Sequence, residues 1–160
     1  MARPLPCDAD GVMTDEQLIA LAREAALKAY APYSGFHVGC AVESADGEVV
    51  TGANLENACY RLGLCAEQSA LTAAQHMFGL HRIRRIAVAG GRVERGRLVG
   101  SAPVTPCGGC RQAIWEAACL AGAEIAVLSA GGEGELFERH TAAELLPSGF
   151  GPATLGGQTG

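Results

Sequence analysis

The sequence predicts an α/β fold: a three-layer α/β/α sandwich with a mixed, mostly five-stranded sheet and helices on both of its faces. Three observations predict it. Strand-like runs alternate with helical patterns, 49% of the 160 residues are hydrophobic, and neither a repeat nor a linker divides the chain. We therefore expect one domain over residues 1–160, with loose tails at 1–13 and 151–160.

A helix is expected to open the fold. Thr14 and Gln17 stand at capping-box spacing, so that the Thr14 hydroxyl can accept from a free amide while Gln17 reaches back. Apolar residues then recur at helical spacing to about Ala29, and Pro32 and Gly35 break the pattern. The first helix should therefore end before the first strand begins.

The middle of the chain predicts three strands, one helix and one loop. In chain order these are strands at 36–44, 48–54 and 82–89, a helix at 66–78 and a loop at 90–104. Asp46-Gly47 suits a hairpin turn between the first two strands. The loop is rich in Gly and Arg, and we expect it to hold at most a short extended piece.

A third helix is expected where Thr105 can act as the N-cap and Pro106 can take the first helical position. It should run to about Leu120, because Gly122 favours a helix end. The remaining expected elements are short strands at 125–128 and 134–138 and a short helix with capping residues Thr141 and Glu144.

Charge and apolar patterning exclude several classes of partner. The formal net charge is -5 and the pI is near 5.3, which disfavours a nucleic-acid binder because such proteins neutralise phosphates with Lys and Arg. No apolar run reaches the length of about 18 residues that predicts a membrane span. Residues 1–8 lack the apolar core of a signal peptide. We expect a cytoplasmic protein with no nucleic-acid or membrane partner.

The seven cysteines, an odd number without a secretion signal, argue against a disulfide framework. Three of them fall at predicted helix starts, in Cys65-Ala-Glu67 and Cys107-Gly-Gly-Cys110. Helix dipoles and free amides at such positions favour thiolates. Three thiolates with one open coordination position are typical of catalytic zinc, so Cys65, Cys107 and Cys110 are candidate ligands.

Glu67 lies two residues after Cys65 and can face a water bound to the metal. Zinc lowers the pKa of bound water from about 15.7 to about 7, and a neighbouring carboxylate can shuttle its protons. This arrangement is the signature of zinc nucleobase deaminases, some of which use three cysteines. A structural zinc site with four cysteines is the alternative. Cys119 lies too far along its helix to join the site, but spacing alone leaves Cys59 open as a fourth ligand.

Five segments that span most of the chain carry a family resemblance. They occur in family order and are Tyr30–Gly39, Asn54–Tyr60, Cys65–Glu67, Thr105–Gln112 and Glu144–Pro152. On these segments the chain resembles the small homotetrameric zinc-dependent cytidine deaminases. The resemblance implies a hydrolase acting on C–N bonds of cyclic amidines, with one Zn2+ per chain. Such an enzyme converts cytidine or deoxycytidine to uridine or deoxyuridine plus ammonia, in pyrimidine salvage.

The resemblance also implies a role for each matching position. It makes Cys65, Cys107 and Cys110 the zinc ligands. It gives Glu67 the transfer of protons among water, ring N3 and leaving ammonia. The substrate contacts that it implies are Phe36 (pyrimidine), Ala66 (base, through its backbone), Asn54 and Glu56 (ribose, Glu56 at the 3′-hydroxyl), and Tyr60 and Phe150 (from a neighbouring subunit). Shared sites of this kind imply a homotetramer. From the residues alone, Asn54 and Glu56 could face one side at a strand end, whereas the three aromatic residues would be assigned to packing.

Gln68 departs from the family pattern, which usually has Arg directly after the catalytic Glu. Three thiolates around one divalent zinc leave an excess negative charge, which Arg offsets and a neutral amide does not. We hypothesise that Gln68 leaves the bound water less acidic and turnover slower. The alternative is that hydrogen bonds from the amide suffice.

Two other functions stay open on the sequence alone. One is deamination of another aminopyrimidine nucleoside or of a nucleoside antibiotic, and the other is a zinc-stabilised binding module without catalysis.

A local basic cluster could bind phosphates, but we expect its members to be solvated or to make subunit contacts. Its members are Arg82, Arg84, Arg85, Arg92, Arg95 and Arg97.

Overall fold

The computed structural model describes residues 13–156, and its mixed sheet has one strand more than the five expected. The strands are β1 (Phe36–Ser44), β2 (Val49–Ala53), β3 (Ile83–Glu94), β4 (Arg97–Val99), β5 (Ala126–Gly131) and β6 (Phe137–Thr141). The helices are α1 (Asp15–Ala26), α2 (Ala66–Met77), α3 (Gly108–Ala121) and α4 (Ala142–Leu145). Short 3-10 helices lie at Tyr60–Leu62, Leu80–Arg82 and Pro152–Leu155.

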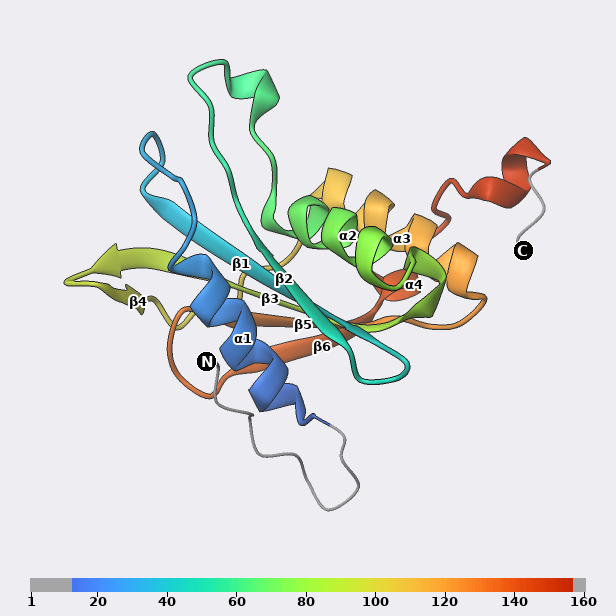
Figure 1. Cartoon of the computed structure of the whole chain (residues 1–160), viewed down its shortest axis with the longest axis horizontal. Helices are drawn as coiled ribbons and strands as arrows, with labels where there is room; N and C mark the ends of the chain where they lie inside the picture. Colours follow the sequence, from blue (N-terminus) through green and yellow to red (C-terminus); the bar gives the residue numbers. More distant parts are fainter. Residues whose placement is uncertain (1–12, 157–160) are drawn as a thin grey trace.

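The strands are ordered β2-β1-β3-β5-β6, and the short β4 pairs with the far end of β3 (Figure 1). Only the β3–β5 pair is parallel, while the β1–β2, β1–β3 and β5–β6 pairs are antiparallel. The chain crosses from β3 to the parallel β5 through α3, as a parallel connection requires. The sheet is therefore mixed, as predicted.

Side chains of the central strands alternate between two apolar clusters, one on each face of the sheet. In β3, Ile86 and Val88 pack on the face that α2, α3 and α4 cover. Ala87 and Ala89 pack on the opposite face, under Leu18 of α1. Helices on both faces of one sheet give the predicted three-layer sandwich.

Two glycines let the helices approach the sheet closely. A Cβ atom on Gly39 of β1 would lie 2.0 Å from the backbone oxygen of Ala22 in α1. A Cβ atom on Gly52 of β2 would lie 2.4 Å from the backbone nitrogen of Ala70 in α2. Glycine is therefore required at both positions. The contact at Gly52 also sets the distance between the sheet and α2, the helix that follows Cys65.

Both predicted capping boxes are present, at Thr14–Gln17 and Thr141–Glu144. The first helix nevertheless ends at Ala26, three residues before the expected end, because Leu27 already starts the turn into β1. The prediction that Thr105 caps the third helix is wrong. Cys107 is the N-cap of α3 and Pro106 precedes it, while the predicted stop at Gly122 is confirmed by its left-handed conformation.

The prediction of a loop at 90–104 is wrong over most of its first half. β3 continues to Glu94 and forms a hairpin with β4, in which Arg95 and Gly96 both adopt positive φ. Pairing with β1 extends β3 to Arg92, which stands opposite Phe36, and pairing with β4 extends it to Glu94. The last strand also lies later than the predicted 134–138, at Phe137–Thr141.

The predicted tails are only partly accounted for, since residues 1–12 and 157–160 lie outside the described residues. Met13 is not loose, because it packs against the apolar cluster that Leu18 of α1 forms with the sheet. Its carbonyl also accepts a hydrogen bond from Arg85. Pro152–Leu155 form a 3-10 helix in place of the loose chain expected there. Among residues 13–156, no helix combines the length and apolar character needed to cross a membrane.

Candidate metal centre and active site

Three cysteine side chains meet where α2 and α3 begin. Cys65 is the N-cap of α2, Cys107 is the N-cap of α3, and Cys110 lies in the first turn of α3. Their sulfur atoms all lie within 4.8 Å of one another. The structure therefore brings together the three predicted ligands, which are far apart in sequence, as one group able to hold a metal ion.

The donor set fits zinc. Tetrahedral zinc with bonds of about 2.3 Å to sulfur places its sulfur ligands about 3.8 Å apart, which the observed spacing accommodates. Cys59 and Cys119 are not members of the group formed by the described residues. The structural site with four cysteines is therefore not the arrangement found, and three protein ligands leave the fourth position open, as in catalytic zinc sites.

The protein environment acts differently on the three thiols. Backbone N–H groups of the first turn of α3, chiefly that of Cys110, lower the pKa of the Cys107 thiol because they stabilise its thiolate. Burial raises the pKa of the Cys65 thiol and that of the Cys110 thiol. Three adjacent thiolates also repel one another, so the positive charge of a divalent metal is what allows all three to be ionised together.

Glu67 is the second residue of α2, and only 4% of its surface is exposed. Burial raises the pKa of its carboxyl group above the ordinary value. A carboxyl group whose neutral form is favoured in this way is the type of group that serves as a general acid–base in enzymes. Glu67 therefore has the chemical character expected of the proton-transfer residue.

A cleft of about 470 Å³ runs from the cysteine group toward the segment after β2. The predicted site residues that line it are Cys65, Cys107, Glu67, Ala66, Phe36, Asn54 and Glu56. Phe36 is 38% exposed and lines this cleft, whereas its residue type alone predicted a packing role. One end of the cleft therefore carries the cysteine group and the carboxyl group of Glu67. The other end carries the amide of Asn54 and the carboxylate of Glu56.

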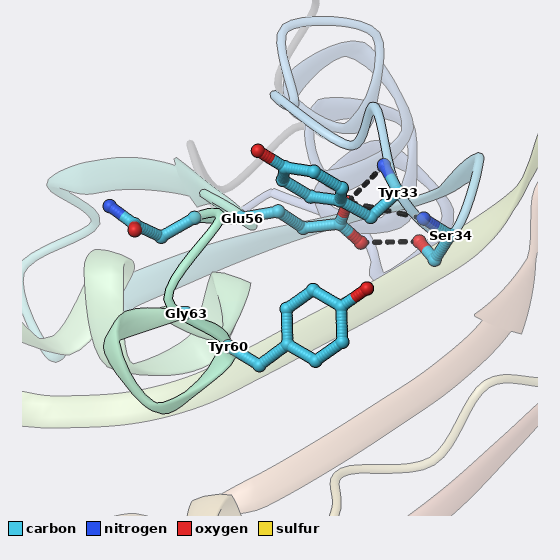
Figure 2. Close-up of a pocket in the computed structure, with 6 residues that line it drawn as sticks. Tyr33, Ser34, Glu56, Tyr60 and Gly63 are labelled. Atoms are coloured by element: carbon cyan, nitrogen blue, oxygen red, sulfur yellow. Dashed lines mark hydrogen bonds between the residues drawn. The ribbon is translucent and has the colours of Figure 1, made fainter.

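Asn54 and Glu56 both line the cleft, as their spacing predicted, but neither is a free loop residue. The Asn54 amide accepts a hydrogen bond from the backbone N–H of Val38 (2.9 Å) and donates to the carbonyl of Phe36 (3.1 Å). The Glu56 carboxylate accepts from the backbone N–H groups of Tyr33 (2.9 Å) and Ser34 (3.2 Å) and from the Ser34 hydroxyl (Figure 2). These bonds, led by that of the hydroxyl, lower the pKa of Glu56.

Tyr60 and Phe150 do not line this cleft in their own chain. Tyr60 is 79% exposed and lines a neighbouring hollow of about 350 Å³, which shares Ser34, Glu56 and Gly63 with the cleft. Its ring lies edge-on to that of Tyr33, with the ring centroids 5.8 Å apart (Figure 2). Phe150 is 56% exposed, and its carbonyl accepts a hydrogen bond of 2.7 Å from Gln112 of α3. Both rings are therefore available at the surface of one chain.

Gln68 lies half-buried on α2 and lines a groove between α2 and α3. Its amide nitrogen is 4.0 Å from where a Cβ atom of Gly109 would stand, so it faces the start of α3. Arg111 does not replace the missing arginine, since its guanidinium donates to the carbonyls of Pro106 (2.9 Å) and Leu145 (3.2 Å).

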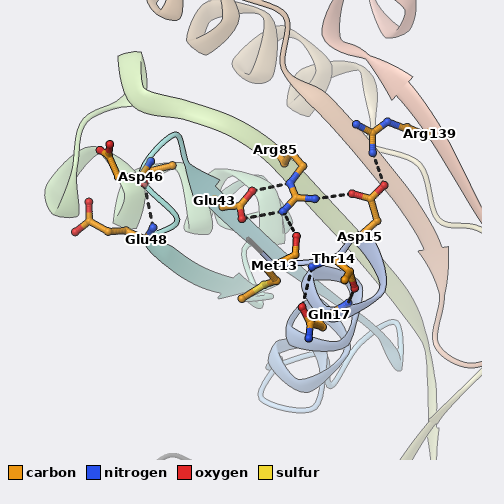
Figure 3. A network of polar contacts seen from close by, with 10 residues as sticks. Met13, Thr14, Asp15, Gln17, Glu43, Asp46, Glu48, Arg85 and Arg139 are labelled. Carbon is orange, nitrogen blue, oxygen red and sulfur yellow. Dashed lines mark hydrogen bonds and ion pairs between the residues drawn. The ribbon is translucent and has the colours of Figure 1, made fainter. Parts of the chain in front are cut away.

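Four members of the basic cluster, Arg84, Arg92, Arg95 and Arg97, are exposed, which agrees with the expectation that its members are solvated or make subunit contacts. Arg85 differs from that expectation, because it is only 7% exposed and forms ion pairs with Glu43 and Asp15 (Figure 3). Arg82 pairs with Asp46 and Glu48. No signal in the sequence could identify Glu43 as the buried partner of Arg85, or the exposed Ser34 as a partner of Glu56.

Comparisons with known proteins place the chain among zinc-binding deaminases. The family described as "Cytidine and deoxycytidylate deaminase zinc-binding region" matches residues 12–122. A cytidine deaminase of Halalkalibacterium halodurans is 40% identical over 138 residues, which cover 86% of this chain and 95% of that protein. A crystal structure of cytidine deaminase from Burkholderia pseudomallei superposes with a TM-score of 0.74 at 37% identity and covers 86% of this chain and 100% of that one. The chain therefore belongs to the zinc-dependent cytidine deaminase family.

Proposed function

We propose that this protein catalyses the hydrolytic deamination of cytidine and deoxycytidine to uridine and deoxyuridine, with release of ammonia. One observation carries the proposal: a single cleft joins the cysteine group and the buried Glu67 to the polar pair Asn54 and Glu56. The two ends suit the two parts of a nucleoside, because the amino group to be hydrolysed and the sugar hydroxyls lie at opposite ends of the molecule.

Cys65, Cys107 and Cys110 are the proposed zinc ligands, one ion per chain. Zinc, when bound, supplies a water molecule whose pKa is lowered toward neutrality. The placement of two ligands at N-caps and one in a first helical turn fixes them on rigid elements. Precise placement matters because a small displacement of a reacting group lowers the rate strongly.

Glu67 is the proposed proton carrier. The reaction forms a C4–O bond with water and breaks the bond between C4 and the amino nitrogen. One proton of the water must move to ring N3, where it stays in the product, and the other must move to the departing nitrogen, which leaves as ammonia. Glu67 is buried and borders the cleft beside Cys65, and its burial raises the pKa of its carboxyl group. A positioned acid–base group of this kind contributes roughly 10²–10⁴-fold to a rate.

The remaining contacts position the nucleoside. Phe36 offers a ring face or edge to the pyrimidine, and the Ala66 backbone is the proposed partner of the base. Asn54 and Glu56 are the proposed partners of the sugar, Glu56 accepting from the 3′-hydroxyl. A carboxylate at this position also disfavours a nucleotide, because it would repel a phosphate beside it. The pairing of Arg82 and Arg85 with acidic residues likewise supports a nucleoside over a polynucleotide.

The protein is further proposed to act as a homotetramer, a single domain per chain, in which Tyr60 and Phe150 complete the cleft of a neighbouring subunit. Both rings are exposed and neither lines the cleft of its own chain, which supports this assignment. Light scattering of the purified protein tests the tetramer, and the mass of one chain would contradict it.

A cytoplasmic role in pyrimidine salvage is also proposed, and the free thiols of all cysteines that the structure describes fit it.

Ammonia release tests the proposed reaction. Purified zinc-loaded protein is assayed with cytidine, deoxycytidine and other aminopyrimidine nucleosides, and Glu124→Ala, an exposed carboxylate outside the cleft, serves as the control variant. We expect release from cytidine and deoxycytidine by wild type and by the control. Release only from another aminopyrimidine would assign a different substrate, and zinc binding with no release from any of them would identify a binding module.

A further inference from the structure

Ser34 lies in the tight turn between α1 and β1, and its hydroxyl contacts two residues of the cleft. The hydroxyl donates a hydrogen bond to Oε1 of Glu56 and accepts one of 3.0 Å from the backbone N–H of Phe36. In Figure 2 the Glu56 carboxylate points directly at this turn. One hydroxyl therefore connects a residue at the sugar end of the cleft with the strand that carries its aromatic residue.

The Glu56 carboxylate has a nearly complete set of donors. Its Oε2 atom accepts from the backbone N–H groups of Tyr33 and Ser34, and its Oε1 atom accepts from the Ser34 hydroxyl. An ionised carboxylate offers about four acceptor positions. The three bonds leave one position, on Oε1, so Glu56 can accept one further hydroxyl and no more.

The backbone around Ser34 holds this arrangement in place. Tyr30 donates to the carbonyl of Asn54 (3.0 Å) and accepts from the N–H of Glu56 (2.8 Å). Leu55 and Leu64 exchange two further backbone hydrogen bonds, of 3.0 and 2.9 Å, directly before Cys65. The Ser34 turn, the Glu56 segment and the first zinc ligand are therefore tied to one another through the backbone.

We propose that Ser34 is a positioning residue that orients Glu56 so that its one open acceptor meets a single sugar hydroxyl of the nucleoside. This inference rests on the proposed function. Hydrogen bonds from the same turn lower the pKa of Glu56, which keeps the carboxylate ionised and acceptor-only. Without the Ser34 hydroxyl, Oε1 loses the donor that fixes it, while Oε2 keeps its two backbone donors.

The experiment compares three nucleosides in wild type, Ser34→Ala and Ser34→Thr. Cytidine and 2′-deoxycytidine carry the 3′-hydroxyl, and 3′-deoxycytidine lacks it. We expect Ser34→Ala to lower kcat/KM by about tenfold for the first two, mainly through KM, as the loss of a hydrogen bond to a charged group would. The value for 3′-deoxycytidine should change by less than about twofold, and Ser34→Thr, which keeps the hydroxyl, should restore discrimination.

Equal losses for cytidine and 3′-deoxycytidine would overturn the inference, because Ser34 would then not act through Glu56. If Ser34→Ala does not fold, Ser34→Cys, with a weaker donor, carries the same comparison. Binding of the three nucleosides measured by calorimetry separates this inference from the function. Wild type that neither binds nor deaminates cytidine refutes both, whereas active wild type with unchanged discrimination in Ser34→Ala refutes the inference alone.

Discussion

Glu43 and Arg85 form a buried ion pair between β1 and β3, where they stand directly opposite each other in the strand register. Arg85 donates from Nε to one carboxylate oxygen at 2.6 Å and from Nη2 to the other at 2.8 Å. It also donates to Asp15 at the start of α1 (2.7 Å), and Asp15 in turn pairs with Arg139 of β6 (Figure 3). Through Asp15 and Arg139, the ion pair therefore belongs to a network that links α1 to β1, β3 and β6.

Removing one partner of this pair should destabilise the fold strongly. We expect Glu43→Ala to lower the free energy of unfolding by about 3–5 kcal/mol, because it leaves the Arg85 guanidinium buried without its main counter-charge. Urea denaturation measures this loss. Asp46→Ala, which breaks an exposed pair with Arg82, should cost no more than about 1 kcal/mol. Equal costs for the two variants would show that burial of the first pair has no energetic weight.

Each cysteine of the metal group should be necessary for zinc binding. We expect wild type to bind one zinc per chain and Cys110→Ser to bind it far more weakly, because a serine hydroxyl replaces a thiolate ligand. Cys59→Ser should bind one zinc per chain, since Cys59 lies outside the group. Metal analysis after gel filtration gives both values. Retention of zinc by Cys110→Ser, or its loss in Cys59→Ser, would reassign the ligands.

Gln68→Arg tests the effect of the missing positive charge. We expect higher turnover near neutral pH and a pH–rate profile whose rising limb moves to lower pH, because an arginine offsets the excess charge of the thiolates. Thr72→Arg, one turn further along α2 in the same groove, is the matched control and should have a smaller effect. A profile that is unchanged in Gln68→Arg would mean that the amide already suffices.

Stability at acid pH should report on Glu56. Hydrogen bonds lower its pKa in the folded protein below the ordinary value of 4.5, so the unfolded chain binds more protons near that pH. The contribution of the charged carboxylate is therefore complete above pH 4.5 and is lost as the pH falls through the lowered value. We expect the difference in Tm between wild type and Glu56→Gln to be constant from pH 7 to about 5 and to shrink below 4.5. A difference that shrinks already above pH 5 would contradict the lowered pKa.

Local patterns predicted the elements that depend on near neighbours in the sequence. The Thr14–Gln17 box, the limits of β1 and the stop at Gly122 were all correct, because caps and strand alternation act within a few residues. The cysteines could likewise be assigned, since helix starts place Cys65 and the Cys107–Cys110 pair on rigid ends.

Contacts between distant segments could not be predicted in this way. β3 continues through Gly90 and Gly91, residues typical of loops, because β1 pairs with both of them and β5 pairs with Gly90. A Cβ atom on Gly91 would lie 2.0 Å from the carbonyl oxygen of Val99, so close packing selects the glycine. The bonds of Ser34 to Glu56 and of Arg85 to Glu43 likewise join segments that no local pattern relates.

The most direct test of the account is ammonia release from cytidine by wild type and by Glu67→Gln at equal zinc content. Glutamine keeps the size of the side chain but cannot carry a proton. We expect turnover to fall at least about 10²-fold while cytidine still binds, because the zinc ligands and the sugar contacts are intact. Turnover within a few-fold of wild type would contradict the assignment of Glu67 as the proton carrier, and with it the chemistry proposed for this cleft.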